Sequence, residues 1–183
     1  YPEHHQKSTL ILHIGENTSL ILGCVRGKIQ VLTQLHVGAQ SLTDALRDQG
    51  HSTENWDKRD EFQVPESFIR ALGEKVDTGK YDDIFRPVFD GWRQEIDRTI
   101  NGIRKSFALS NDTEVLLSGS AGDILHLDKF IGGILGLNTH FLNPIRNLAF
   151  SPSEDERNNI PFHPTLLTAA IGSGLTLSGT VNV

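Results

Sequence analysis

Two short turns of the chain combine glycine with hydroxyl or amide side chains. Residues 15–19 read Gly-Glu-Asn-Thr-Ser, and residues 118–122 read Ser-Gly-Ser-Ala-Gly. Because glycine lets backbone amides come close to a ligand, turns of this composition can contact an anion such as phosphate. The second turn also precedes a predicted helix, whose amino end favours negative charge. The candidate binding residues of the two turns are Gly15, Asn17, Thr18, Gly119, Ser120, Ala121 and Gly122.

Each turn also has a purely structural interpretation. Residues 15–19 would be an ordinary hairpin turn, and the glycines of residues 118–122 would serve only a tight strand-to-helix connection. Neither a Walker lysine nor a complete Gly-x-Gly-x-x-Gly motif follows the second turn. The sequence alone leaves both interpretations open.

A catalytic interpretation of the second turn has less support. Ser120 lies between small residues, as in a nucleophile elbow, and His126, His140 or His163 would have to complete a triad. However, Ser118 replaces the glycine that such an elbow needs, and few parallel strands would support the site. We therefore predict no catalytic residue.

The composition argues against several classes of site and partner. The eight histidines show no metal-binding spacing, so we predict no metal site. The single cysteine, Cys24, excludes an internal disulfide and favours a reducing compartment. A net charge of −6 argues against nucleic acid as a partner. No apolar run reaches the roughly 18–20 residues that span a bilayer, so we expect no membrane insertion.

The elements that would position the first turn are strands followed by a short helix. Residues 9–15, 19–25 and 29–37 are apolar or alternating runs with tight turns between them, which predicts an antiparallel meander. A helix over residues 42–46 should follow, with Ser41 as its N-cap.

A long helix is the clearest element of the sequence. Apolar residues recur at spacings of three and four over residues 85–107. Pro87 cannot donate an early helical hydrogen bond, so we expect the regular part of the helix to begin near residue 87. The stripe consists of Phe85, Val88, Phe89, Trp92, Ile96, Ile100, Ile103 and Phe107.

Shorter elements complete the pattern. The remaining strands are predicted over residues 114–118 and 139–142, and the remaining helices over residues 65–76, 124–135 and 164–171. A strand–helix–strand order favours parallel pairing with right-handed crossovers. The sequence therefore predicts an α/β fold with a five-stranded mixed sheet, an antiparallel meander plus two parallel strands, flanked by helices.

The order of elements also suggests two lobes. Residues 1–49 and 108–183 would form the core lobe, and residues 50–107 an inserted, mainly helical smaller lobe that begins with a polar surface connection over residues 50–63. The chain contains no methionine, so we expect it to be a piece of a longer protein.

Five motifs occur in a characteristic order. Residues 13–15 read His-Ile-Gly, residues 38–43 Gly-Ala-Gln-Ser-Leu-Thr, residues 116–122 Leu-Leu-Ser-Gly-Ser-Ala-Gly, residues 143–144 Asn-Pro, and residues 168–175 Thr-Ala-Ala-Ile-Gly-Ser-Gly-Leu. This series resembles the second, ribonuclease H-like half of the actin-like ATPases. More specifically, it is similar to the PilM-like proteins of type IV pilus assembly.

The resemblance implies a degenerate nucleotide site. It adds Gly38 to the candidate binding residues and assigns the two turns to the second phosphate hairpin and the adenosine loop. The group has an aspartate where this chain has His13, and an imidazole cannot replace a carboxylate as the partner of a hard cation. The adenosine loop also lacks its paired glycines. The resemblance thus implies ATP binding only together with the other half of the fold, no other cofactor, and no catalytic activity for this chain alone.

The resemblance further implies a scaffold role in the bacterial cytoplasm, peripheral to the inner membrane. Such a scaffold would dock the cytoplasmic tail of an inner-membrane pilus or secretion protein, with self-association as a further contact. The actin-like domain of the type II secretion protein GspL is a related alternative. Two others are an ATP-hydrolysing enzyme of the actin, sugar-kinase and chaperone superfamily, and a filament protein of the FtsA type.

Overall fold

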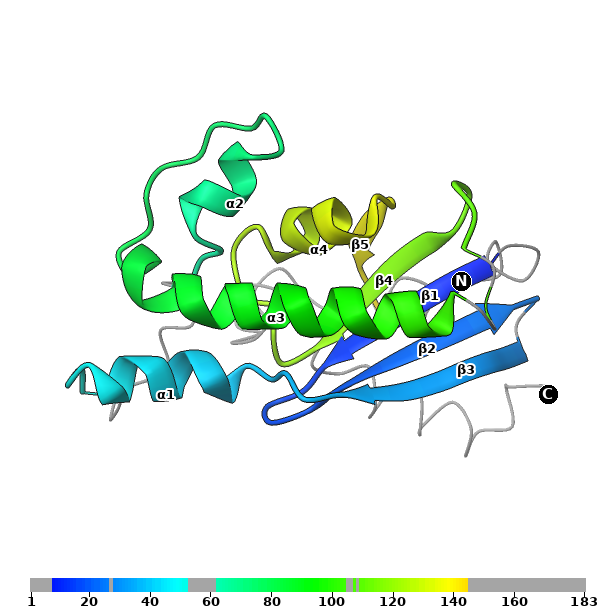
Figure 1. Ribbon diagram of the computed structural model, residues 1–183, viewed down its shortest axis with the longest axis horizontal. Helices are drawn as coiled ribbons and strands as arrows, with labels where there is room; N and C mark the ends of the chain where they lie inside the picture. Colours follow the sequence, from blue (N-terminus) through cyan, green and yellow to red (C-terminus); the bar gives the residue numbers. More distant parts are fainter. Residues whose placement is uncertain (1–7, 27, 53–61, 105–106, 108, 145–183) are drawn as a thin grey trace, which may run out of the picture.

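β1 (Ser8–Ile14) lies at the centre of a five-stranded sheet with the strand order β3-β2-β1-β4-β5 (Figure 1). β2 (Ser19–Val25) and β3 (Lys28–Leu35) form an antiparallel meander with β1. β4 (Glu114–Gly119) pairs in parallel with β1, and β5 (Thr139–Phe141) in parallel with β4. The predicted α/β fold with a mixed five-stranded sheet is confirmed. In this computed structural model, the described residues are 8–26, 28–52, 62–104, 107 and 109–144.

The two faces of β1 have different surroundings. Side chains alternate between the faces of a strand, and Leu10, Leu12 and Ile14 on one face are at most 1% exposed. These three residues belong to the main hydrophobic core, whereas His13 on the opposite face is only half-buried. β4 is buried along both faces from Val115 to Gly119, as expected for an interior parallel strand.

α3 (Asp82–Ile103) packs against α1 (Gln40–Asp48) and α4 (Leu127–Leu135), and Figure 1 shows it lying between them. The helix begins at Asp82 rather than near Pro87. It tolerates Pro87 because the proline removes only one hydrogen bond, close to the amino end, and its ring is exposed. The predicted apolar stripe does face the core. Its buried members within the helix are Phe85, Phe89, Trp92, Ile96, Ile100 and Ile103.

Two predicted helices are shorter than expected. α2 (Glu66–Arg70) covers only the beginning of residues 65–76, because the chain turns at Gly73, whose φ is +83°. α4 begins at Leu127 rather than at residue 124, because His126 adopts the left-handed conformation (φ +65°).

Ser41 is not the N-cap of α1, in contrast to the prediction. The helix already begins at Gln40, with Ala39 in the cap position. The Ser41 hydroxyl instead donates to the carbonyl of Gly38 (2.7 Å) and accepts a hydrogen bond from the indole nitrogen of Trp92 (3.1 Å). It therefore links the start of α1 to α3.

The predicted surface connection is wrong at its end. Phe62 is 2% exposed, and its ring contacts Phe85 edge-on with 5.1 Å between centroids. The amide of Val64 donates to the carbonyl of Leu125 (3.1 Å), and the amide of Leu125 donates to the carbonyl of Phe62 (2.9 Å). This short segment is thus part of the core beside the turn that precedes α4.

Two further predictions are not tested by the described residues. Residues 53–61 and the helix expected over residues 164–171 lie outside them. The division into a core lobe and an inserted lobe over residues 50–107 stays a prediction.

Candidate phosphate-binding edge of the sheet

The two glycine turns lie side by side at one end of the sheet, where β1 and β4 end. We call this end of the two strands the candidate edge. β1 and β4 are parallel and end together, with Ile14 opposite Gly119. The amide of Ser120 donates to the carbonyl of Ile14 (2.8 Å), and Gly15 follows directly after the residue that pairs with Gly119. The strand register therefore makes these two glycines neighbours.

The close approach of β1 and β4 at this point depends on Gly119. Its φ is +99°, and a Cβ at this position would lie 2.2 Å from the carbonyl oxygen of Ile14. A side chain is therefore excluded twice, by the backbone conformation and by the neighbouring strand. The glycine lets the chain leave β4 while it stays hydrogen-bonded to β1.

A third segment, the start of α1, packs on the hairpin between β1 and β2. A Cβ on Gly38 would lie 2.2 Å from the carbonyl oxygen of Glu16, so only glycine fits beneath the hairpin. The amides of Ala39 and Gln40 donate to the carbonyls of Gly15 (3.0 Å) and Glu16 (2.8 Å). These two amides at the amino end of α1 therefore bind the hairpin, and they fix it in place beside the end of β4.

The predicted binding residues differ in how far they are accessible. Asn17 and Thr18 at the tip of the hairpin are exposed, so their side chains can reach a ligand. The others shape the edge or lie partly beneath it. Gly15, Ser120 and Gly122 are half-buried, whereas Gly38, Gly119 and Ala121 are buried. Their role in binding phosphate or adenosine stays a prediction.

His13 occupies the position at which the resemblance implies an aspartate. Its ring nitrogen Nδ1 lies 3.0 Å from the hydroxyl oxygen of Ser118 on β4. Burial lowers the pKa of His13 below its ordinary value of 6.5, so the imidazole is neutral at pH 7. In the described part of the chain, no group of three or more His, Cys, Asp or Glu residues could hold a metal ion. The pair is thus a neutral hydrogen bond between two strands.

The sequence did not single out Ser118 as the partner of His13. Both residues lie in segments that were predicted as strands, but the pairing depends on the register between β1 and β4. That register is set by the packing of the hydrophobic faces, so residues so far apart in sequence cannot be matched by spacing alone.

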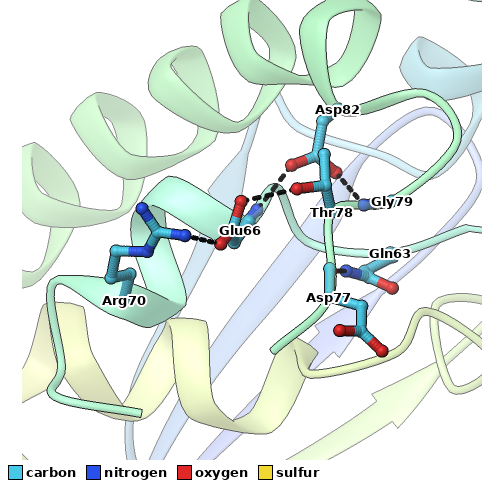
Figure 2. Close-up of polar contacts among 7 residues, drawn as sticks. All are labelled: Gln63, Glu66, Arg70, Asp77, Thr78, Gly79 and Asp82. Carbon is cyan, nitrogen blue, oxygen red and sulfur yellow. Dashed lines mark hydrogen bonds and ion pairs between the residues drawn. The ribbon is translucent and has the colours of Figure 1, made fainter. Parts of the chain in front are cut away.

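A second polar cluster, which the sequence also did not predict, is structural (Figure 2). The carboxylate of Asp82, only 6% exposed, accepts the amides of Glu66 (2.8 Å) and Gly79 (2.8 Å). Burial raises the pKa of Asp82, and the hydrogen bond from Gly79 partly opposes this effect. The Glu66 carboxylate in turn pairs with Arg70 and accepts the Thr78 hydroxyl. Asp82 therefore joins the start of α2 to the start of α3.

Three solved structures resemble this arrangement of strands and helices. Over 99% of its length, the chain matches 48% of a chain in a PilM–PilN type IV pilus biogenesis complex, with a TM-score of 0.68 and 22% identity. It matches 54% of MreB5 of Spiroplasma citri bound to ADP over 96% of its length (TM-score 0.59, 13% identity). It also matches 48% of the ethanolamine utilization protein EutJ from Carboxydothermus hydrogenoformans over 90% of its length (TM-score 0.54, 13% identity).

The chain has the actin-like fold. No protein-family model matches its sequence, and no curated protein does either. The identities are 22% or lower, so the structural likeness establishes the fold alone. This actin-like chain spans about half the length of the EutJ chain and of the chain in the PilM–PilN complex that it matches. Among the described residues, no helix is both long and apolar enough to cross a membrane.

Proposed function

We propose that this chain is the second half of an actin-like scaffold in a type IV pilus or related secretion platform. The scaffold would dock the cytoplasmic segment of an inner-membrane protein. The match over 99% of the chain to a chain of a PilM–PilN type IV pilus biogenesis complex supports this role. The order of motifs along the sequence, from the hairpin at Gly15 to the turn at Gly119, resembles that of PilM-like proteins and supports the same role.

We further propose that the nucleotide site of this scaffold does not hydrolyse ATP. ATP would bind only where the edge at Gly15 and Gly119 faces the other half of the fold. Magnesium prefers carboxylate, carbonyl and water oxygens, and the position that should carry a carboxylate holds a neutral histidine bonded to Ser118. This pair supports a role in holding the sheet together rather than in organising a cation and a water molecule.

Turnover of ATP–Mg by the full-length protein tests this part of the proposal. We expect no magnesium-dependent release of phosphate above the uncatalysed background. Turnover that disappears in a Thr18→Val variant, whose hairpin keeps its fold but loses an exposed hydroxyl, would contradict a scaffold without hydrolysis.

A second candidate is a nucleotide-driven filament protein, and the ADP in the similar MreB5 structure favours it. The two functions differ in how the full-length protein sediments. A filament protein pellets when ATP–Mg is added and stays in solution without it, whereas a scaffold of the proposed kind sediments equally in both conditions.

A further inference from the structure

A groove with an apolar floor lies between α2, α3 and α4. α2 and α4 lie on the other side of α3 from α1 (Figure 1). Its volume is about 400 Å³, within the range of pockets that take a small ligand or one or two large side chains. Phe68, Leu72, Phe130 and Ile134 supply the apolar surface. This groove is built from other elements than the candidate phosphate-binding edge.

Phe68 and Phe130 line the floor of the groove and pack against the buried ring of Phe89. Phe68 and Phe89 each meet Phe130 edge-on, with centroids 5.3 Å and 5.1 Å away, and Phe68 lies 6.4 Å from Phe89. Phe89 and Phe130 are almost fully buried, which holds the ring of Phe68 in position. An apolar group that enters the groove would therefore meet a preformed surface, and it would not have to order flexible side chains.

One wall of the groove is an exposed leucine that rests on a glycine. Leu72 is 43% exposed. A Cβ on Gly133 would lie 2.6 Å from a methyl carbon of Leu72, so the glycine lets the leucine settle against α4. The ion pair between Glu74 and Lys129 ties the segment after Leu72 to the same helix.

The rim of the groove carries more positive than negative charge. Arg86, Asp90 and Arg93 line it from one face of α3. Within the described residues, Arg93 has no ion-pair partner, and Arg86 has only Asp83 at 3.6 Å, a residue whose side chain is 98% exposed. Arg86 is therefore largely balanced by its neighbouring aspartates, and Arg93 is the rim cation that no ion pair within the described residues satisfies.

We propose that this groove binds an acidic peptide segment of a partner protein. An apolar side chain of the segment would lie on Phe68 and Ile134, and a neighbouring carboxylate would pair with Arg93. Arginine suits this role because its planar guanidinium can hold a carboxylate with two parallel hydrogen bonds. An apolar anchor beside a charged contact is a common arrangement at the centre of protein interfaces. Binding here requires neither nucleotide nor the pilus role proposed above.

Fluorescence anisotropy with three labelled amphipathic peptides tests this site on the whole chain. The peptides share one pattern of leucines and differ only in the flanking residues, which are Glu, Gln or Lys. We expect the Glu peptide to bind at least about tenfold more tightly than the Lys peptide. Arg93→Glu should reverse this order, and Ile134→Asp should weaken binding of all three peptides.

Arg98→Glu is the matched control, because Arg98 lies on the same helix, is exposed and does not line the groove. Circular dichroism checks that each variant is folded. Equal affinities for the Glu and Lys peptides, no binding of any peptide, or the same effect from Arg98→Glu and Arg93→Glu would each overturn the proposal. So would a dimer of the wild-type chain that Arg93→Glu dissociates, because the occupant would then be a second copy.

Discussion

At the scale of single residues, hydrogen bonds and close backbone contacts define the candidate edge. His13 and Ser118 join β1 to β4 through their side chains, and Gly119 brings the two backbones together just beyond this pair. Gly38 does the same for the hairpin and α1. A change at any of these residues is therefore expected to affect the stability of the fold as well as the binding of a ligand.

The pH dependence of unfolding tests the state of His13. Burial lowers its pKa in the folded protein, so the unfolded chain binds a proton more readily. The contribution of His13 is fully present above pH 6.5, the ordinary pKa, and is lost as the pH falls through the lower value of the folded state. Urea unfolding should show a smaller loss of stability on acidification for His13→Gln than for the wild type.

Gly119→Ala should destabilise the chain by about 2 kcal/mol or more, because the left-handed backbone and the Ile14 carbonyl both oppose a Cβ. Gly91→Ala is the control, since Gly91 is an exposed position of α3 with open space around it. This change should stabilise by roughly 0.5–1 kcal/mol. Thermal unfolding of both variants measures the difference. A Gly119→Ala variant as stable as the wild type would contradict the close packing of β1 and β4.

At the scale of elements, Asp82 determines how α2 and α3 meet. Its carboxylate accepts amides from the start of α2 and from the turn before α3, so neither short segment depends on apolar packing alone (Figure 2). The arrangement also places α2 above α4, where the two helices form part of the groove.

Asp82→Ala should cost about 2–4 kcal/mol, because it leaves the amides of Glu66 and Gly79 without an acceptor in a partly buried place. Asp83→Ala, at the neighbouring exposed position, should change the free energy of unfolding by less than about 0.5 kcal/mol. Denaturant titration compares the two variants. Equal losses would show that the cluster does not depend on the buried carboxylate.

The sequence predicted the elements with clear periodicity and missed the contacts between distant segments. The apolar stripe of α3 and the meander of β1 to β3 follow from local patterns, and both are confirmed. The burial of Phe62 could not be predicted, because it depends on hydrogen bonds to Leu125. The early start of α1 likewise depends on the carbonyls of the hairpin, which lie far back in the sequence.

The candidate site was predicted only in part, because some of its residues have a local signal and others depend on contacts between distant segments. The glycines of the two turns were identified from residue type, and the parallel register of β1 and β4 confirms that they are neighbours. The partner of His13 and the cluster at Asp82 depend on tertiary packing and have no local signal.

At the scale of the whole molecule, the two proposed surfaces are formed by different elements. The edge at Gly15, Gly38 and Gly119 would face the other half of an actin-like protein, whereas the groove between α2, α3 and α4 would face a peptide of a partner. The two surfaces lie on different elements, so a variant of one should leave the other intact. Arg93→Glu is therefore expected to change peptide binding without changing any response to ATP–Mg.

Binding of the full-length protein to a PilN-type membrane protein tests the proposed scaffold role most directly. The probe is a synthetic peptide with the sequence of the cytoplasmic segment of the PilN-type protein from the same organism, titrated by isothermal calorimetry, with a scrambled peptide as control. We predict saturable binding with one peptide per chain. The affinity should not depend on hydrolysis of added ATP. No detectable heat at peptide concentrations of about 100 μM, or equal binding of the scrambled peptide, would contradict the role as a pilus scaffold.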